Sequence, residues 1–235
     1  RFMVGNYPPG RLRNDGWLET PIPRDLTNRR LPFRNMSLTG DQAASFPRSR
    51  GFIPQEQYLQ LAKADVIFAF FGYNESFNGP DKASQYEKQL ADLIKKYRST
   101  HPNGKSFPRI VLFSPIAHEN LNNPNLPNGN TNNARLAVYT KATEKAAKDN
   151  GVAFVNLYNP SLAIYGKSSN KLTINGIHLS TDGNRQIAEV IASALLNKNV
   201  KSSPSNEPLR QAVLEKNWHW HNRYRATDGN DVWGG

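Results

Sequence analysis

Apolar positions along the chain form two kinds of pattern, short continuous runs and longer stretches with helical spacing. The runs are typical of strands buried on both faces, and turn or polar residues end each of them. Five such strands are expected, at residues 1–4, 31–35, 65–71, 109–114 and 153–156. Residues 82–98 and 182–197 instead repeat apolar side chains three and four positions apart, which predicts two helices with one buried face each.

The alternation of strands and helices predicts an α/β fold, with a further helix between the Asn-rich loop at 120–133 and Gly151. Neighbouring parallel strands need long crossovers, which are usually helical. We therefore expect a three-layer α/β/α sandwich around a central, mainly parallel, five-stranded sheet. Loops after the carboxyl ends of such strands gather along one edge, where ligands bind. The loops that contain Gly5, Gly40, Gly72, His118 and His178 should share that rim.

Composition along the chain divides it into three parts. Residues 1–197 hold all the strands and form one α/β domain. Residues 198–208 are rich in Lys, Ser, Asn and Pro and predict a linker. Residues 209–235 predict a C-terminal helix with an aromatic and basic extension. We expect its aromatic residues to pack against the domain or a protein partner. The alternative is that they form a flat surface that binds a sugar. These residues are Trp218, Trp220, Tyr224 and Trp233.

The composition limits the chemistry that is available. The chain has 235 residues and no cysteine, which excludes disulfides, thiolate metal sites and a cysteine nucleophile. No haem attachment motif is present, no cofactor is expected, and the histidines are too dispersed to predict a metal site. The longest apolar run, at 66–71, is much shorter than the roughly 20 residues of a transmembrane helix.

A net charge of +11 and an isoelectric point near 9.9 favour anionic surroundings. The basic residues are scattered in short pairs such as Arg29-Arg30 rather than in a stripe, so nucleic acid is not the expected partner. The chain begins without an initiator Met or a signal-peptide pattern. We expect a mature or trimmed form, and leave open whether sequence precedes Arg1 or follows Gly235.

Three blocks on successive strand ends carry a family resemblance. The segment 35–41 ends in Gly40-Asp41, the segment 72–75 reads Gly-Tyr-Asn-Glu, and the segment 175–180 reads Asn-Gly-Ile-His-Leu-Ser. Over residues 1–197 the chain resembles the SGNH (GDSL-type) hydrolases. The resemblance implies a flavodoxin-like fold, acyl ester or carbohydrate substrates and an extracytoplasmic location. It implies an oxyanion donor at the Gly40 N–H and at the Asn74 amide, and a general base at His178.

Two positions depart from the pattern of that family. The first block normally reads Gly-Asp-Ser, whereas this chain has Gly5-Asn6-Tyr7, with a phenol where the nucleophilic hydroxyl should stand. The Asp three residues before the catalytic His is Asn175, and in a serine protease the same exchange lowers turnover about 10⁴-fold. The triad is therefore degenerate.

The residues leave several mechanisms open. His178 could activate water or a substrate hydroxyl directly, or it could form a proton-transfer pair with Tyr7; Ser37 could also be a displaced nucleophile. For direct activation the imidazole would need an orienting carboxylate, for which the candidates are Glu75, Glu119 and Asp182. The rival to a hydrolase is a catalytically inactive SGNH-like module that binds a partner or scaffolds a larger assembly.

His118 and Glu119 follow the fourth strand and are expected to line the same pocket. Gly40 and Gly72 could instead be simple turn residues, and Asn74 a loop cap. The segment 222–229 resembles the one that follows this domain in planctomycete-type multidomain relatives. The predicted site residues are His178, Tyr7 and Asn175 for catalysis, with Gly40, Asn74, Asn6, Glu75 and His118 around the oxyanion or substrate.

Overall fold

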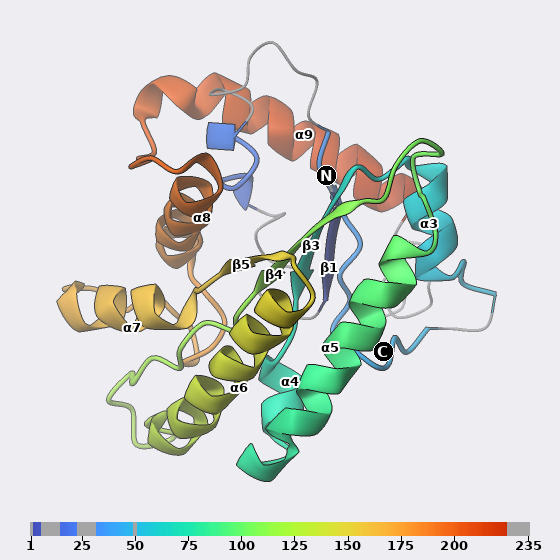
Figure 1. Cartoon of the computed structure of the whole chain (residues 1–235). Coiled ribbons are helices and arrows are strands. Elements are labelled where there is room, and N and C mark those ends of the chain that lie inside the picture. The colour runs from blue at the N-terminus through green and yellow to red at the C-terminus, as the bar shows by residue number, and fades with distance from the viewer. Residues whose placement is uncertain (1, 6–14, 23–31, 49–50, 225–235) are drawn as a thin grey trace.

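A parallel five-stranded sheet forms the centre of the computed structural model, which describes residues 2–5, 15–22, 32–48 and 51–224 (Figure 1). Its strands are β1 (Phe2–Gly5), β2 (Arg34–Asn35), β3 (Val66–Phe70), β4 (Arg109–Phe113) and β5 (Ala153–Val155). They are ordered β2-β1-β3-β4-β5, and every neighbouring pair is parallel. This is the order of flavodoxin-like folds, so the expected fold class is confirmed.

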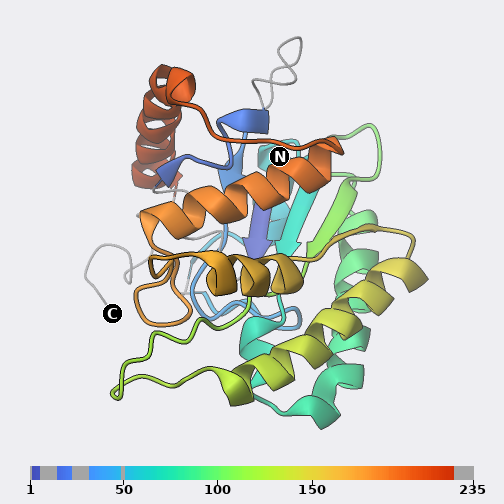
Figure 2. The same ribbon diagram turned by 90° about the vertical axis from the view of Figure 1, so that its left-hand side faces the viewer.

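Helices cover both faces of the sheet. The helices are α3 (Gln55–Leu61), α4 (Tyr73–Ser76), α5 (Ala83–Arg98), α6 (Asn130–Asp149), α7 (Tyr158–Lys167), α8 (Thr181–Leu196) and α9 (Glu207–Tyr224), with short 3₁₀ turns at Pro80–Lys82 and Pro204–Asn206. Alternate strand residues point to opposite faces. Ile67 and Ala69 of β3 pack with α5 and α6, whereas Phe68 and Phe70 pack with α8. Figure 2 shows α8 crossing in front of the sheet on this second face.

The apolar pattern located most elements to within one or two residues. β2 is shorter than expected. It begins at Arg34, so Pro32 and Phe33 precede it, and Leu31 lies outside the described residues. The pattern did not predict α3, α4 or α7. In α7 the third residue is Pro160, a helix breaker that is tolerated only in the first turn. Because α4 is a single turn, it has too few residues for a periodic signal.

Helix α9 lies against the edge of the sheet that β2 forms. The indole N–H of Trp220 donates to the Asn35 carbonyl at 3.4 Å, and the Arg34 guanidinium lies 4.6 Å from the centre of the Trp220 ring. Glu19 accepts hydrogen bonds from Lys216 and from the Asn217 amide. A helix beside an edge strand prevents pairing with a second chain. By contrast, Trp218 is 64% exposed.

Candidate active site

The carboxyl ends of β1, β2 and β3 meet at one edge of the sheet. Gly5, the last residue of β1, pairs with Phe70, the last residue of β3. Gly5 has a φ of +114°, and a Cβ atom there would lie 1.9 Å from the Phe70 carbonyl oxygen. Only glycine allows this conformation at this separation. The loops after β2 and β3, which contain Gly40 and Asn74, therefore begin on either side of the end of β1.

Gly40 and Asn74 belong to neighbouring loops. Gly40 is exposed and has a φ of +90°. The next residue, Asp41, is fully buried, and its carboxylate is held by the Arg48 guanidinium at 2.5 and 3.0 Å. The amide nitrogen of Asn74 donates to the Asp41 carbonyl at 3.4 Å. The Asn74 side chain therefore contacts the residue that follows Gly40. The Asp41–Arg48 ion pair, which the sequence did not predict, fixes the Gly40 loop.

Glu75 ties the same two loops together from inside. Its side chain is 3% exposed, and its two oxygens accept from the Ala43 N–H at 2.8 Å and the Gly72 N–H at 2.9 Å. Burial raises the pKa of Glu75, while the two backbone hydrogen bonds act in the opposite direction. The carboxylate is therefore occupied in holding the Gly40 and Asn74 loops.

Replacing Glu75 by glutamine should lower the free energy of unfolding by about 1–3 kcal/mol, because one acceptor oxygen cannot serve two buried N–H groups. The pKa of Glu75 is raised in the folded state, so the folded chain binds this proton more tightly than the unfolded chain. Its stabilising effect is complete below the unfolded pKa of about 4.3 and decreases as pH rises toward the folded pKa. Urea unfolding of wild type and Glu75→Gln should thus show a stability difference that shrinks from about pH 4 upward. A difference that grows with pH would contradict this assignment.

His178 stands at the end of a tight loop that precedes α8. The side-chain oxygen of Asn175 lies 3.0 Å from the His178 Nδ1 and accepts from the His178 backbone N–H at 2.9 Å. Ser180 caps α8 by accepting from the Gly183 N–H, which fixes the chain two residues after His178. The imidazole is half-buried. Asn175 therefore orients the ring through a neutral acceptor oxygen.

A buried network supports this loop from below. Both carboxylate oxygens of Glu119 accept from the Leu172 N–H, and one also accepts from the N–H and hydroxyl of Thr173 at 2.7 Å each. The Thr173 hydroxyl in turn accepts from the Gly176 N–H, and the Glu119 N–H donates to the Gly176 carbonyl. These contacts connect the segment that follows β4 to the loop that contains His178.

His118 packs beneath the same loop and is only 3% exposed. A Cβ atom on Gly176, which has a φ of +89°, would lie 2.3 Å from its Nε2. Burial lowers the pKa of His118, and a contact with the Pro127 carbonyl opposes this in part. His118 is thus a neutral support behind the loop rather than a side chain on the open rim.

The expectation that a carboxylate orients His178 is wrong for the three candidates. Glu75 and Glu119 are bound to backbone N–H groups, and Asp182 binds Arg185 and Gln186 on the surface of α8. Buried loop N–H groups compete for Glu75 and Glu119, whereas side chains of the same helix bind Asp182. Ser37 is 6% exposed and its hydroxyl donates to the Asn35 side chain at 2.6 Å, which disfavours it as a nucleophile. Asn6 and Tyr7 lie outside the described residues.

No group of three or more His, Cys, Asp or Glu side chains in the described ranges is arranged to hold a metal ion. In the same part of the chain, no helix has the length and apolar character needed to cross a membrane. His219 and His221 are two positions apart, so their side chains would point to the same side only in an extended segment. Both residues belong instead to the helix α9.

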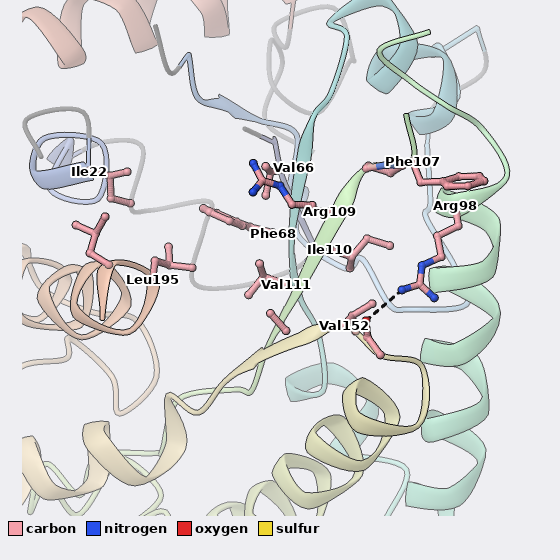
Figure 3. Close-up of a pocket in the computed structure, with 14 residues that line it drawn as sticks. Ile22, Val66, Phe68, Arg98, Phe107, Arg109, Ile110, Val111, Val152 and Leu195 are labelled. Atoms are coloured by element: carbon pink, nitrogen blue, oxygen red, sulfur yellow. Dashed lines mark hydrogen bonds between the residues drawn. The ribbon is translucent and has the colours of Figure 1, made fainter. Parts of the chain in front are cut away.

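A separate hollow of about 780 Å³ lies at the amino ends of the strands, opposite the carboxyl ends that carry the candidate site (Figure 3). It is bordered by Val66, Arg109 and Ala153, the first residues of three strands, and by Leu195 near the end of α8. Ligands of open α/β sheets bind at the carboxyl ends of strands. This hollow at the amino ends is therefore distinct from the rim that carries His178.

Residues 5–186 match the profile of the GDSL-like lipase/acylhydrolase family. The chain belongs to this family. The matched range includes the loops with Gly40, Asn74 and His178 and ends within α8, so α9 lies outside it. A sequence comparison with curated proteins gave no match.

Solved structures of GDSL-like and related esterases share the fold. An acetyl xylan esterase has 19% identity and a TM-score of 0.56, with 83% of this chain and 100% of the other covered. A carbohydrate acetylesterase from Sinorhizobium meliloti has 14% identity, a TM-score of 0.54 and coverage of 84% and 99%. A catalytic mutant of an acetylxylan esterase from Geobacillus stearothermophilus has 13% identity, a TM-score of 0.59 and coverage of 86% and 96%.

Proposed function

We propose that this member of the GDSL-like family hydrolyses acyl esters carried by carbohydrates, with His178 as the base. The observation that carries the proposal is the hydrogen bond from the Asn74 amide to the Asp41 carbonyl, which brings the Asn74 side chain to the loop that contains Gly40. Family membership supports ester hydrolysis, and the names of the acetyl xylan and carbohydrate esterases of similar fold support an acetylated sugar as substrate. As in the resemblance, we place the reaction outside the cytoplasm.

The resemblance aligns Tyr7 with the family's serine, so the proposed reaction uses water instead of a serine nucleophile. His178 takes a proton from a water molecule as the water oxygen bonds to the ester carbonyl carbon. The carbonyl oxygen becomes negative and accepts hydrogen bonds from the Gly40 N–H and the Asn74 amide, worth about 3–4 kcal/mol each in a dry site. The carbon–oxygen ester bond then breaks, and the proton on His178 passes to the leaving alkoxide. The products are a carboxylic acid and a sugar hydroxyl.

A binding module is the second candidate, favoured by the loss of the serine and by the exposed Trp218 on α9. In that case the rim would bind a saccharide without turnover, or the basic and aromatic C-terminal extension would bind a protein partner. The experiment that separates the candidates offers the purified protein aryl acetates, acetylated xylo-oligosaccharides and uronic-acid oligosaccharides. Turnover and saccharide binding are measured on the same preparation. Release of acetate supports the hydrolase, whereas binding without release supports the module.

Exchange of Tyr7 for serine tests whether only the nucleophile has been lost. A serine hydroxyl at this position could attack the carbonyl with His178 as its base, and general-base assistance is worth about 10²- to 10⁴-fold. We expect Tyr7→Ser to raise aryl acetate hydrolysis by at least about tenfold and to produce a burst of the aryl alcohol as an acyl-enzyme forms. Tyr7→Ala, which adds space but no hydroxyl, is the matched control. Equal gains in both variants would contradict this interpretation.

A further inference from the structure

We propose that Asn175 is a positioning residue that holds the neutral ring of His178 in the tautomer with its proton on Nδ1. The lone pair is then on Nε2, the nitrogen that a base needs. The catalytic use of this tautomer rests on the proposed function, whereas the tautomer itself is a property of the folded chain. The resemblance places Asn175 at the position of the family's usual Asp, so the tautomer depends on the contacts of the Asn175 amide.

The backbone determines which end of the Asn175 amide faces the ring. The side-chain oxygen accepts from the backbone N–H groups of His178, at 2.9 Å, and of Ile177, at 3.3 Å. An amide NH₂ group in the same place would point its hydrogens at two other donors. The atom 3.0 Å from the His178 Nδ1 is therefore an oxygen, which can only accept. A hydrogen bond at this distance requires the proton on Nδ1.

His118 has the opposite arrangement and provides an internal comparison. The side-chain oxygen of Asn132 accepts from the Arg135 guanidinium at 2.5 Å, so the amide nitrogen faces the His118 Nδ1 at 2.9 Å. This nitrogen can only donate, so the His118 Nδ1 must accept, and the ring proton is on Nε2. Two asparagines thus fix two neighbouring histidines in opposite tautomers.

This geometry separates the two effects of exchanging the usual Asp for Asn. In a serine protease the exchange lowers turnover about 10⁴-fold because the amide leaves the histidine in the wrong tautomer. Here the N–H groups of Ile177 and His178 turn the amide oxygen toward the ring, so the tautomer is retained. Only the negative charge that would stabilise an imidazolium is lost. Asn175 therefore permits a base at His178, although a weaker one than an Asp would support.

The tautomer can be measured on the wild-type protein by ¹⁵N NMR of the histidine rings, about two pH units above the ordinary histidine pKa of about 6.5. His178→Gln and His118→Gln assign the two rings. We expect the His178 signals to show a protonated Nδ1 and an unprotonated Nε2, and the His118 signals to show the reverse. A protonated Nε2 on His178, or a mixture of its two tautomers, would overturn the proposal.

Variants at position 175 test the cause. Asn175→Asp retains the acceptor oxygen and should leave the His178 tautomer unchanged, whereas Asn175→Ala should allow the Nε2-protonated form to appear. The matched control is Asn103→Ala, because Asn103 also accepts from backbone N–H groups two and three residues ahead but contacts no imidazole through this oxygen. It should leave His178 unaffected. A single Nδ1-protonated form in Asn175→Ala, or a tautomer change in Asn103→Ala, would overturn the proposal.

A kinetic measurement connects the tautomer to catalysis. If ester hydrolysis is found, kcat of Asn175→Ala should fall by about 10²-fold, the lower end of what a positioned base supplies, while KM changes much less. A fall in kcat without a change in the His178 tautomer would overturn the role of Asn175. If the wild type hydrolyses no ester, the proposed function fails, but the NMR result still decides the tautomer.

Discussion

Exchange of His178 for alanine is expected to lower kcat/KM for ester hydrolysis by about 10²- to 10⁴-fold, the range supplied by a positioned general base. The imidazole stands at the end of a loop fixed by Asn175 and by the network beneath Gly176. In the described residues around this loop the carboxylates are bound elsewhere, so no neighbouring carboxylate is positioned to replace the ring. The loss should appear mainly in kcat, because water activation occurs in the chemical step.

The control for this experiment is His219→Ala, which removes an exposed imidazole from α9. It should leave both kcat and KM unchanged. Thermal unfolding should show that His178→Ala retains the fold, since the ring is only half-buried. Equal hydrolysis by wild type and His178→Ala, in preparations of equal purity, would contradict the assignment of His178 as the base.

Replacing Gly176 by alanine is expected to lower the free energy of unfolding by about 2–5 kcal/mol, the sum of backbone strain and overpacking. The φ of Gly176 is +89°, a conformation that costs about 1–2 kcal/mol for an L-residue. The added Cβ would also lie 2.3 Å from the His118 Nε2 and 3.0 Å from the Glu119 carbonyl oxygen. Relief of this overlap would shift the loop that carries His178, so turnover should fall as well.

A variant at Gly79 separates the cost of backbone strain from the cost of overpacking. The φ of Gly79 is +91°, and a Cβ atom there would have no atom within 4 Å. Gly79→Ala should show the backbone cost alone, and chemical denaturation of the two variants should differ by about 1–3 kcal/mol. Combining Gly176→Ala with His118→Ala should restore part of the lost free energy of unfolding, because the ring that overlaps the new Cβ is removed. Equal stability of Gly176→Ala and Gly79→Ala would contradict the tight contact between Gly176 and His118.

The sequence was sufficient to place the loops that contain Asn74 and His178, because each one adjoins a strong strand or helix signal. Val66–Phe70 is a continuous apolar run and Gly72 follows it, so the location of Asn74 at a strand end could be predicted. His178 likewise precedes the amphipathic helix α8. The contacts of these side chains could not be predicted, because Glu75 and Asp41 bond to groups 32 residues away and seven residues away, respectively.

By itself, the sequence determined the alternation of strands and helices and therefore the parallel sheet, because apolar periodicity is a local property of the chain. It also predicted which loops stand on the rim, among them those with Gly40, Asn74 and His178. Only the tertiary structure decided that buried N–H groups bind Glu75 and Glu119, that α9 lies against β2, and that the Asn175 oxygen faces His178. These outcomes depend on which distant donors and acceptors the fold brings together, and on the need of each buried polar group for a partner.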